Sequence, residues 1–269
     1  MASFNKADWL VPTGLIALAF IPVLAGVFRL SLLASGGPLN PENARFVNAP
    51  IPVVVHIVSV TIYSQLGAFQ FAPGFRRRRP DWHRAAGRIL VVAGLVAALS
   101  GLWMALFYAI VPADSALLHG FRLFFGSAMA LSIVFGYLAI RRRDVARHQD
   151  WMCRAYAIAL AAGTQAITQL PLLLLYGAPD ELTLALMMGA AWVANLAAAE
   201  WYIHGRRTAA SIRQSSDDGA TVADPTDLPA RSEPLRVTSR PPSVHHAPKS
   251  VLRRKEEDHL HGRGLIRNP

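Results

Sequence analysis

Six long apolar stretches constrain the fold of this chain more than any other feature of its sequence. A bilayer core about 30 Å thick is crossed by about 20 helical residues, and each stretch is about that long. Charged residues make up 16% of the sequence, against about a quarter in soluble domains, and they are concentrated between the stretches. No stretch alternates polar and apolar residues over its length, as a membrane β-barrel would require, so helices remain. We predict an all-α integral membrane protein with six transmembrane helices in one bundle, near Thr13–Leu33, Ile51–Ala72, Ala86–Val111, Leu118–Ile140, Arg154–Tyr176 and Glu181–His204.

The positively charged residues are distributed asymmetrically between the two ends of these predicted helices. A net charge of +10 would point to nucleic acid in a soluble chain, whereas in a membrane protein Lys and Arg collect in cytoplasmic loops. Only Arg29, Arg45 and Arg122 fall on one side. We therefore predict that the other side, with both chain termini, is cytoplasmic, and that the partner is the lipid bilayer rather than nucleic acid. That side carries Lys6, Arg76 to Arg79, Arg84, Arg88, Arg141 to Arg143, Arg147 and Arg154.

The composition changes after the last apolar stretch. Pro, Ser, Arg, Asp and Glu dominate residues 205–269, aromatic residues are absent, and no apolar period survives. We predict a transmembrane domain over residues 1–204 and a disordered, basic cytoplasmic tail over residues 205–269. The single cysteine, Cys153, excludes an internal disulfide and a metal cage made of cysteines alone.

Two arginine-rich loops on the predicted cytoplasmic side share a pattern. Phe75–Arg88 and Arg141–Arg154 each bring an arginine block together with a histidine and a tryptophan just before an apolar helix. The arginines at 76–79 are explained by topology alone, because they hold the loop in the cytoplasm. A site at the inner surface is expected between the cluster around His83 and the cluster around His148.

Polar residues recur on one face of the second predicted helix, at intervals of three or four residues: His56, Ser59, Tyr63, Gly67 and Gln70. Such a face is expected to look into the bundle rather than at lipid. For the serine, the tyrosine and the glutamine the simpler role is hydrogen bonding between helices, worth about 0.6 to 2 kcal/mol per contact.

Two further patterns predict contacts between helices. Gly87, Gly94 and Gly101 form a stripe with a spacing of seven, which lets a neighbouring helix or a flat cofactor approach the backbone closely. Arg154 and Glu200 fall at the same level near the cytoplasmic ends of their helices, which favours an ion pair between them.

Four histidines of the membrane part fall into two pairs. His56 and His119 lie toward the outer side on helices two and four, and His83 and His148 lie at the cytoplasmic boundary on helices three and five. Two facing imidazoles are what a six-coordinate haem b needs as axial ligands. The alternative is that these histidines cap helices or hydrogen-bond to headgroups. Arginines for the haem propionates are Arg84, Arg88 and Arg154 on the inner side and Arg122 on the outer side.

These residues together resemble a known family. The resemblance rests on the following residues and motifs: His56, Gly67-Ala68-Phe69-Gln70-Phe71, His83-Arg84-x-x-Gly87-Arg88, His148-x-x-Trp151-Met152-x-Arg154, and Asn195-Leu196 followed by Glu200. Over about residues 50 to 204 the chain resembles the bacterial membrane proteins grouped as domain of unknown function 2306. The resemblance implies an integral protein of the cytoplasmic (inner) membrane without an established activity, and His119 lies outside its pattern. The order of the histidines is also similar, in layout alone, to that of the ascorbate-linked two-haem b-type cytochromes.

Three functions from different classes remain open at this point. The first is haem b electron transfer or a quinone-linked oxidoreductase. The second is a small-molecule transporter or permease with the polar faces of helices two, five and six along its path, although neutral Tyr, Thr and Gln at the midplane count against ion coupling. The third is a structural or regulatory protein that binds anionic lipid headgroups through Arg84, Arg88 and Arg154. No P-loop, HExxH, GxSxG or Cys-x-x-Cys motif is present, so a hydrolase of a familiar kind is not expected.

Overall fold

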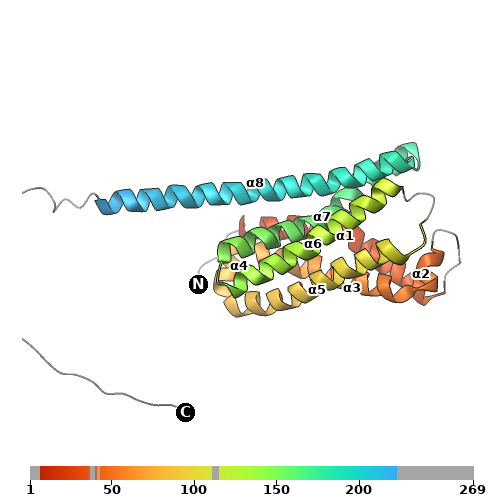
Figure 1. Cartoon of the computed structure of the whole chain (residues 1–269), viewed down its shortest axis with the longest axis horizontal. Helices are drawn as coiled ribbons and strands as arrows, with labels where there is room; N and C mark the ends of the chain where they lie inside the picture. The colour runs from red at the N-terminus through yellow and green to blue at the C-terminus, as the bar shows by residue number, and fades with distance from the viewer. Residues whose placement is uncertain (1–6, 37–39, 41–42, 111–114, 223–269) are drawn as a thin grey trace, which may run out of the picture. The chain divides into compact units, whose positions relative to one another are not determined.

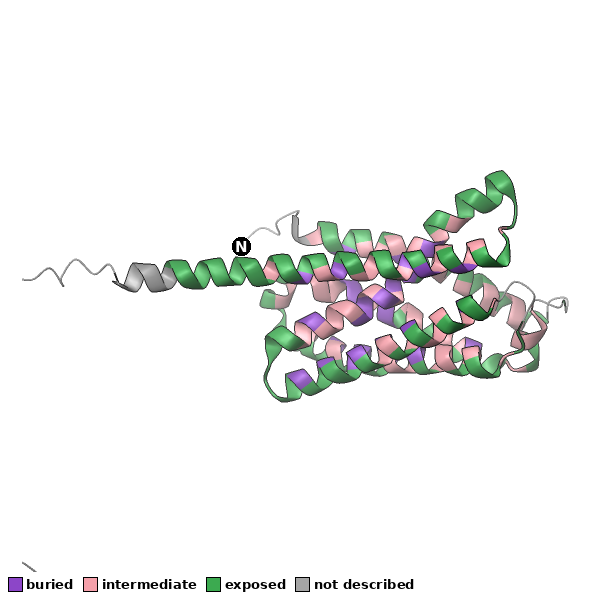
Figure 2. Ribbon diagram, turned by 45° about the horizontal axis from the view of Figure 1, so that its top comes forward, coloured by how far each residue is buried: buried purple, intermediate pink, exposed green. Residues whose placement is uncertain are grey.

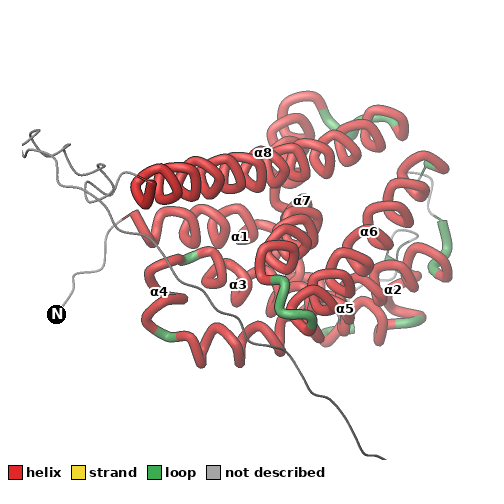
Figure 3. Tube along the Cα trace, turned by 60° about the vertical axis from the view of Figure 1, so that its left-hand side comes forward, coloured by secondary structure: helices red, strands yellow, loops and turns green. Residues whose placement is uncertain are grey.

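The protein is all-helical over the residues that the structure, a computed structural model, describes: 7–36, 40, 43–110 and 115–222. No strand occurs among them (Figure 3). Six of the helices are long and apolar enough to cross a membrane, which confirms the predicted fold class. The elements are α1 (Ala7–Ala34), α2 (Ala44–Asn48), α3 (Pro50–Ala68), the 3₁₀ turn η1 (Phe69–Phe71), α4 (Pro73–Arg78), α5 (Pro80–Phe107), α6 (Ala116–Arg141), α7 (Val145–Tyr176) and α8 (Glu181–Val222) (Figure 1).

Contacts divide the chain into two units, Met1–Gly219 and Ala220–Pro269, and the helical bundle belongs to the first. The last helix differs from the sequence prediction, because α8 continues past His204 to Val222 instead of giving way to a disordered tail. The apolar pattern ends near His204, but the helix continues because Arg206 and Arg207 of α8 pair with the buried Asp150 carboxylate of α7. The remainder of the predicted tail, residues 223–269, lies outside the described residues.

Helices α5 and α7 begin earlier than their apolar stretches do. Pro80 starts α5, where its missing N–H costs nothing and its fixed φ suits the first turn. Asp144 caps α7, and its carboxylate accepts a hydrogen bond from the Arg147 backbone N–H at 3.0 Å. Both arginine-rich loops are therefore shorter, and more of their residues are helical, than the apolar pattern predicts.

The two ends of the bundle are distinguished by their charges. The arginine-rich end contains α4, the start of α5 and the turn between α6 and α7, and the opposite end contains α2. At the arginine-rich end four aromatic rings join α1, η1, α4 and α5. Neighbouring ring centroids in this group lie between 4.8 and 6.2 Å apart, and its members are Trp9, Phe69, Phe75 and Trp82.

Small residues allow the helices to approach one another closely. A Cβ at Gly94 of α5 would lie 2.6 Å from the Tyr63 ring of α3, and one at Gly101 would lie 3.2 Å from His56. The glycine stripe thus serves the packing of α3 against α5 at these two positions, whereas Gly87 has open space beside it. Buried residues gather where the helices face one another (Figure 2). Many large apolar side chains of the helices are exposed, as expected for surfaces that face lipid.

Candidate functional site

A cavity of about 330 Å³ lies in the half of the bundle nearer the opposite end. We call it the chamber. Its walls come from α2, α3, α5, α6, α7 and α8, so the long helices other than α1 all contribute to it. Its volume falls at the small end of the range for sites that hold small molecules. The described residues that line it are Arg45, Phe46, His56, Val60, Ala97, Ala98, Gly101, Met104, Ala105, Tyr108, Arg122, Gly126, Met129, Ile158, Ala159, Ala162, Gln165, Met188 and Trp192.

His56 is the imidazole on the wall of the chamber. Its Nδ1 lies 2.9 Å from the Ala97 carbonyl oxygen of α5 and 3.2 Å from Ser100 Oγ. A carbonyl oxygen can only accept, so Nδ1 carries the hydrogen and donates it. In the neutral ring the other nitrogen, Nε2, is then an acceptor, and no described residue donates to it.

Gln165 is the amide on the wall formed by α7. Its Nε2 donates to the Met188 carbonyl oxygen of α8 at 3.2 Å, which fixes the amide between the two helices. In the part of the chain that the structure describes, nothing donates to its Oε1. The side chain is nearly fully buried and lines the chamber, so a donor to its oxygen would have to lie in the chamber.

The rim of the chamber is basic and aromatic. The Arg45 guanidinium donates to the Ala109 carbonyl oxygen at 3.3 Å and lies over the Phe46 ring, 4.9 Å from its centroid. The Tyr108 hydroxyl donates to the Ala49 carbonyl oxygen at 2.6 Å, which ties α2 to the end of α5. Burial raises the pKa of the Tyr108 hydroxyl above its ordinary value, so this group stays a donor.

The two predicted histidine pairs have different outcomes. His119 lies in the first turn of α6 and is not among the residues lining the chamber with His56, so the structure does not unite the outer pair there. His83 and His148 are brought close enough for the charge of one to act on the other, together with Arg76 and Arg84. His83 and His148 lie near the starts of α5 and α7, and the site expected between their clusters stays a prediction.

The imidazoles of the inner pair differ in their hydrogen bonds. His148 Nδ1 lies 2.9 Å from the Gly136 carbonyl oxygen, so this nitrogen donates and Nε2 is left as an acceptor. His83 Nδ1 is buried, and no described residue forms a hydrogen bond with it. A buried polar atom without a partner is uncommon in a folded protein and often marks a functional position.

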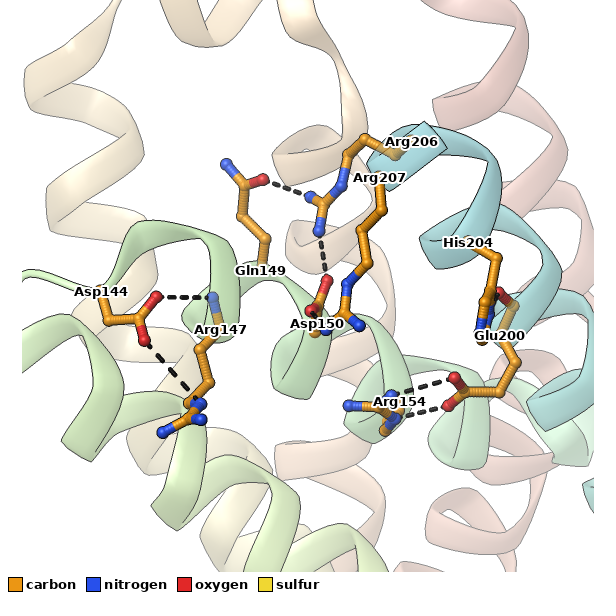
Figure 4. A network of polar contacts seen from close by, with 9 residues as sticks. All are labelled: Asp144, Arg147, Gln149, Asp150, Arg154, Glu200, His204, Arg206 and Arg207. Atoms are coloured by element: carbon orange, nitrogen blue, oxygen red, sulfur yellow. Dashed lines mark hydrogen bonds and ion pairs between the residues drawn. The ribbon is translucent and has the colours of Figure 1, made fainter. Parts of the chain in front are cut away.

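Beside the inner pair, α7 and α8 are joined by ion pairs (Figure 4). Arg154 and Glu200 form the predicted pair, with Nε–Oε1 at 2.5 Å and NH2–Oε2 at 2.9 Å. The Arg154 guanidinium also lies 4.8 Å from the centre of the Trp151 ring. Arg154 is thus held by two partners, Arg84 pairs with exposed Asp81 at 2.5 Å, and Arg88 is exposed.

A second cluster of ion pairs between α7 and α8 was not predicted from the sequence. Asp150 has a side chain that is only 2% exposed, and its two oxygens pair with Arg206 and Arg207 of α8. Arg206 also donates to the Gln149 side-chain oxygen (Figure 4). The sequence analysis placed both arginines in the tail. A signal for a continued helix was present, because the two arginines follow just after the predicted end of the helix at His204 and Asp150 had no predicted partner.

A compact metal cage is not found in the described part of the chain, where no three or more His, Cys, Asp or Glu side chains are grouped to hold an ion.

Comparisons with known proteins give one match. A family model described as "Predicted membrane protein (DUF2306)" matches residues 53–203, which run from α3 into α8 and include the inner histidine pair and the lining residues of the chamber from His56 to Trp192. No curated protein and no solved structure matches the chain.

Proposed function

We propose that this chain, which belongs to the DUF2306 family of predicted membrane proteins, binds a small, mostly apolar molecule in the chamber and passes it across the cytoplasmic membrane as a permease. The observation that carries the proposal is the chamber itself, a volume left between α2 and the five spanning helices other than α1.

The chemistry of the walls supports this role. Met129, Met188 and Trp192 supply apolar surface, and His56 and Gln165 supply a small number of fixed polar groups. An apolar wall with a few polar groups is the usual composition of a small-molecule site. None of the described lining residues is a carboxylate, which favours facilitated passage over coupling to protons or cations.

The proposal can be tested by asking what copurifies with the protein. Ala162 lines the chamber and is not packed in the core, so we expect the ring in Ala162→Phe to fill part of the volume. Ala194 of α8 is exposed and does not line the chamber, so Ala194→Phe is the matched control. We expect a lipophilic compound in organic extracts of the wild type and the control that is depleted at least several-fold in Ala162→Phe, as measured by mass spectrometry. Equal amounts in all three would contradict binding in the chamber.

Transport is tested separately with the compound so identified. Proteoliposomes of the wild type are expected to take it up faster than empty liposomes, and Ala162→Phe is expected to abolish the difference. A flat uptake curve for the wild type would remove the permease while leaving the binding site.

A second candidate function rests on the inner histidine pair. His148 donates Nδ1–H to a backbone carbonyl, which is how proteins commonly orient a metal-binding imidazole. His83 lies near enough to feel the charge of His148, and its buried Nδ1 has no hydrogen-bond partner among the described residues. These two residues would hold the iron of a haem b, with Arg84 or Arg88 near its propionates. Haem would supply one-electron redox chemistry, and the chain would be an electron-transfer protein.

An absorption spectrum decides this second candidate. Protein purified after haem-supplemented expression is expected to show a Soret band that is lost in His83→Ala and in His148→Ala. His119→Ala serves as the control and should keep the band, because His119 lies at the start of α6, at the end of the bundle opposite to His83 and His148. Wild-type protein without a Soret band would rule the haem out.

Binding of anionic lipid headgroups at the arginine-rich end has narrower support than the sequence predicted. Arg77 and Arg88 are exposed there, but Arg154 is held by Glu200 and Trp151. We therefore assign lipid contact to the exposed arginines and treat it as an interaction with the bilayer surface.

A further inference from the structure

We infer that the molecule held in the chamber carries a hydroxyl group, as an alcohol or a phenol does, and donates its hydrogen to His56 Nε2. The inference rests on the proposed binding function and adds the chemical class of the ligand to it.

The first step is the state of His56. Its Nδ1–H is used by the Ala97 carbonyl oxygen at 2.9 Å, with Ser100 Oγ at 3.2 Å. The Ser100 hydroxyl in turn donates within its own helix, to the Val96 carbonyl oxygen at 2.6 Å. The described lining residues are mostly apolar and include no carboxylate, so the chamber favours the neutral ring over the charged one. Neutral His56 with hydrogen on Nδ1 presents Nε2 as a pure acceptor.

The second step is the state of Gln165. Its amide nitrogen is turned toward the Met188 carbonyl oxygen, which leaves Oε1 as the group without a donor among the described residues. The polar groups that α3 and α7 contribute to the chamber therefore both end in free acceptors. A buried acceptor that finds no donor costs free energy, so a ligand that supplies one is favoured.

The third step excludes other head groups. A carboxylate, a ketone or an ether offers acceptors only and would leave His56 Nε2 unsatisfied. An ammonium group offers donors, but its charge would be buried in a mostly apolar cavity, and none of the described lining residues is a carboxylate that could pair with it. A neutral hydroxyl donates its one hydrogen to His56 Nε2 at no charge cost. The apolar walls require the remainder of the molecule to be hydrophobic.

The experiment uses two brominated probes that differ only in this hydrogen, 4-bromophenol and 4-bromoanisole, at neutral pH, where the phenol is un-ionised. Bromine quenches nearby indole fluorescence, and Trp192 lines the chamber, where its ring stacks on Phe125 at 4.9 Å. The site-specific signal is the quenching of the full-length protein in detergent minus that of Trp192→Phe. Partition of each probe into protein-free micelles is measured separately and used to correct its concentration.

His56→Asn is the informative variant, because its amide nitrogen replaces Nδ1 and can still donate to Ala97, whereas no atom replaces Nε2. We expect the wild type to bind the phenol about three- to tenfold more tightly than the anisole, and His56→Asn to bind the two equally. Equal binding in the wild type would overturn the inference and leave the chamber as a binding site. A preference that survives in His56→Asn would overturn the role of His56. Absence of Trp192-dependent quenching with both probes would overturn the inference and the proposed function together.

Discussion

Arg154 and Glu200 show how one residue pair joins two spanning helices near a membrane boundary. Their side chains are 23% and 38% exposed, so water screens the pair only in part. We expect Glu200→Gln to lower the free energy of unfolding by about 1 to 2 kcal/mol, because it removes the negative charge of the carboxylate that accepts both hydrogen bonds from the Arg154 guanidinium. The measurement is reversible unfolding in mixed micelles, with a double-mutant cycle that adds Arg154→Gln.

The matched control is the exposed pair of Arg84 and Asp81, which has the same 2.5 Å separation but side chains 62% and 92% exposed. Asp81→Asn is expected to change stability by less than about 0.5 kcal/mol. Equal effects of the two substitutions would show that burial between α7 and α8 adds nothing to the Arg154 pair.

Asp180 gives the chain a stability that depends on pH. Its carboxylate caps α8, accepting from the Thr183 hydroxyl at 2.7 Å and from the Thr183 and Leu182 backbone N–H groups at 3.0 and 3.1 Å. These bonds, first that of the Thr183 side chain, lower the pKa of Asp180 below its ordinary 3.8. The stabilisation is therefore complete above pH 3.8 and is lost as the pH falls through the lowered pKa.

We expect Asp180→Ala to lower the thermal midpoint at pH 7, and the difference from the wild type to shrink only below pH 3.8. Thermal scans of both proteins between pH 7 and pH 3 measure it. A difference that already falls between pH 7 and pH 5 would contradict the assignment to this carboxylate.

At the scale of whole elements, the contact of α1 with α7 depends on Gly163. A Cβ at this position would run into the backbone carbonyl of Leu18, which cannot move out of the way as a flexible side chain would. Gly163→Ala is therefore expected to destabilise the protein by about 2 kcal/mol or more, or to abolish its folded yield.

Gly120 provides the control for this substitution, because it lies in α6 with open space where a Cβ would be. Gly120→Ala should be neutral or stabilise by about 0.5 to 1 kcal/mol, since alanine is the better helix former. If the two substitutions behaved alike in thermal unfolding, α1 would not pack against α7 as described.

The extension of α8 past the predicted span depends on Asp150. This buried carboxylate holds Arg206 and Arg207, which are also the sites where trypsin would cut. Asp150→Asn is expected to speed tryptic cleavage after these two arginines several-fold, because it frees them from their partner. Cleavage after exposed Arg213 is the internal control and should not change. An unchanged ratio of the two cleavages would mean that the ion pairs do not hold the helix.

At the scale of the whole molecule, the charge asymmetry predicts which end of the bundle faces the cytoplasm. In a Cys153→Ala background, Arg77→Cys at the arginine-rich end and Asn40→Cys at the opposite end both place a thiol on the surface. We expect a membrane-impermeant maleimide to label Asn40→Cys in intact cells and to label Arg77→Cys only after permeabilisation. The reverse pattern would invert the orientation.

The sequence by itself determined the class of the molecule. Apolar stretches as long as a bilayer is thick admit only spanning helices, so the helix count and the approximate spans follow from Thr13 to His204 without any tertiary information. The ion pair of Arg154 with Glu200 also followed, because two opposite charges at one depth in a low-dielectric setting have few other partners.

Tertiary structure decided which polar residues meet. His56 and His119 have matching depths along their helices, yet only His56 lines the chamber, because depth fixes a position along the membrane normal and leaves the rotation of each helix open. The rotation is set by contacts such as Gly94 against Tyr63 and Gly163 against Leu18, which join residues far apart in sequence. The chamber, with His56 and Gln165 on its walls, exists only once those contacts have fixed how the helices face one another.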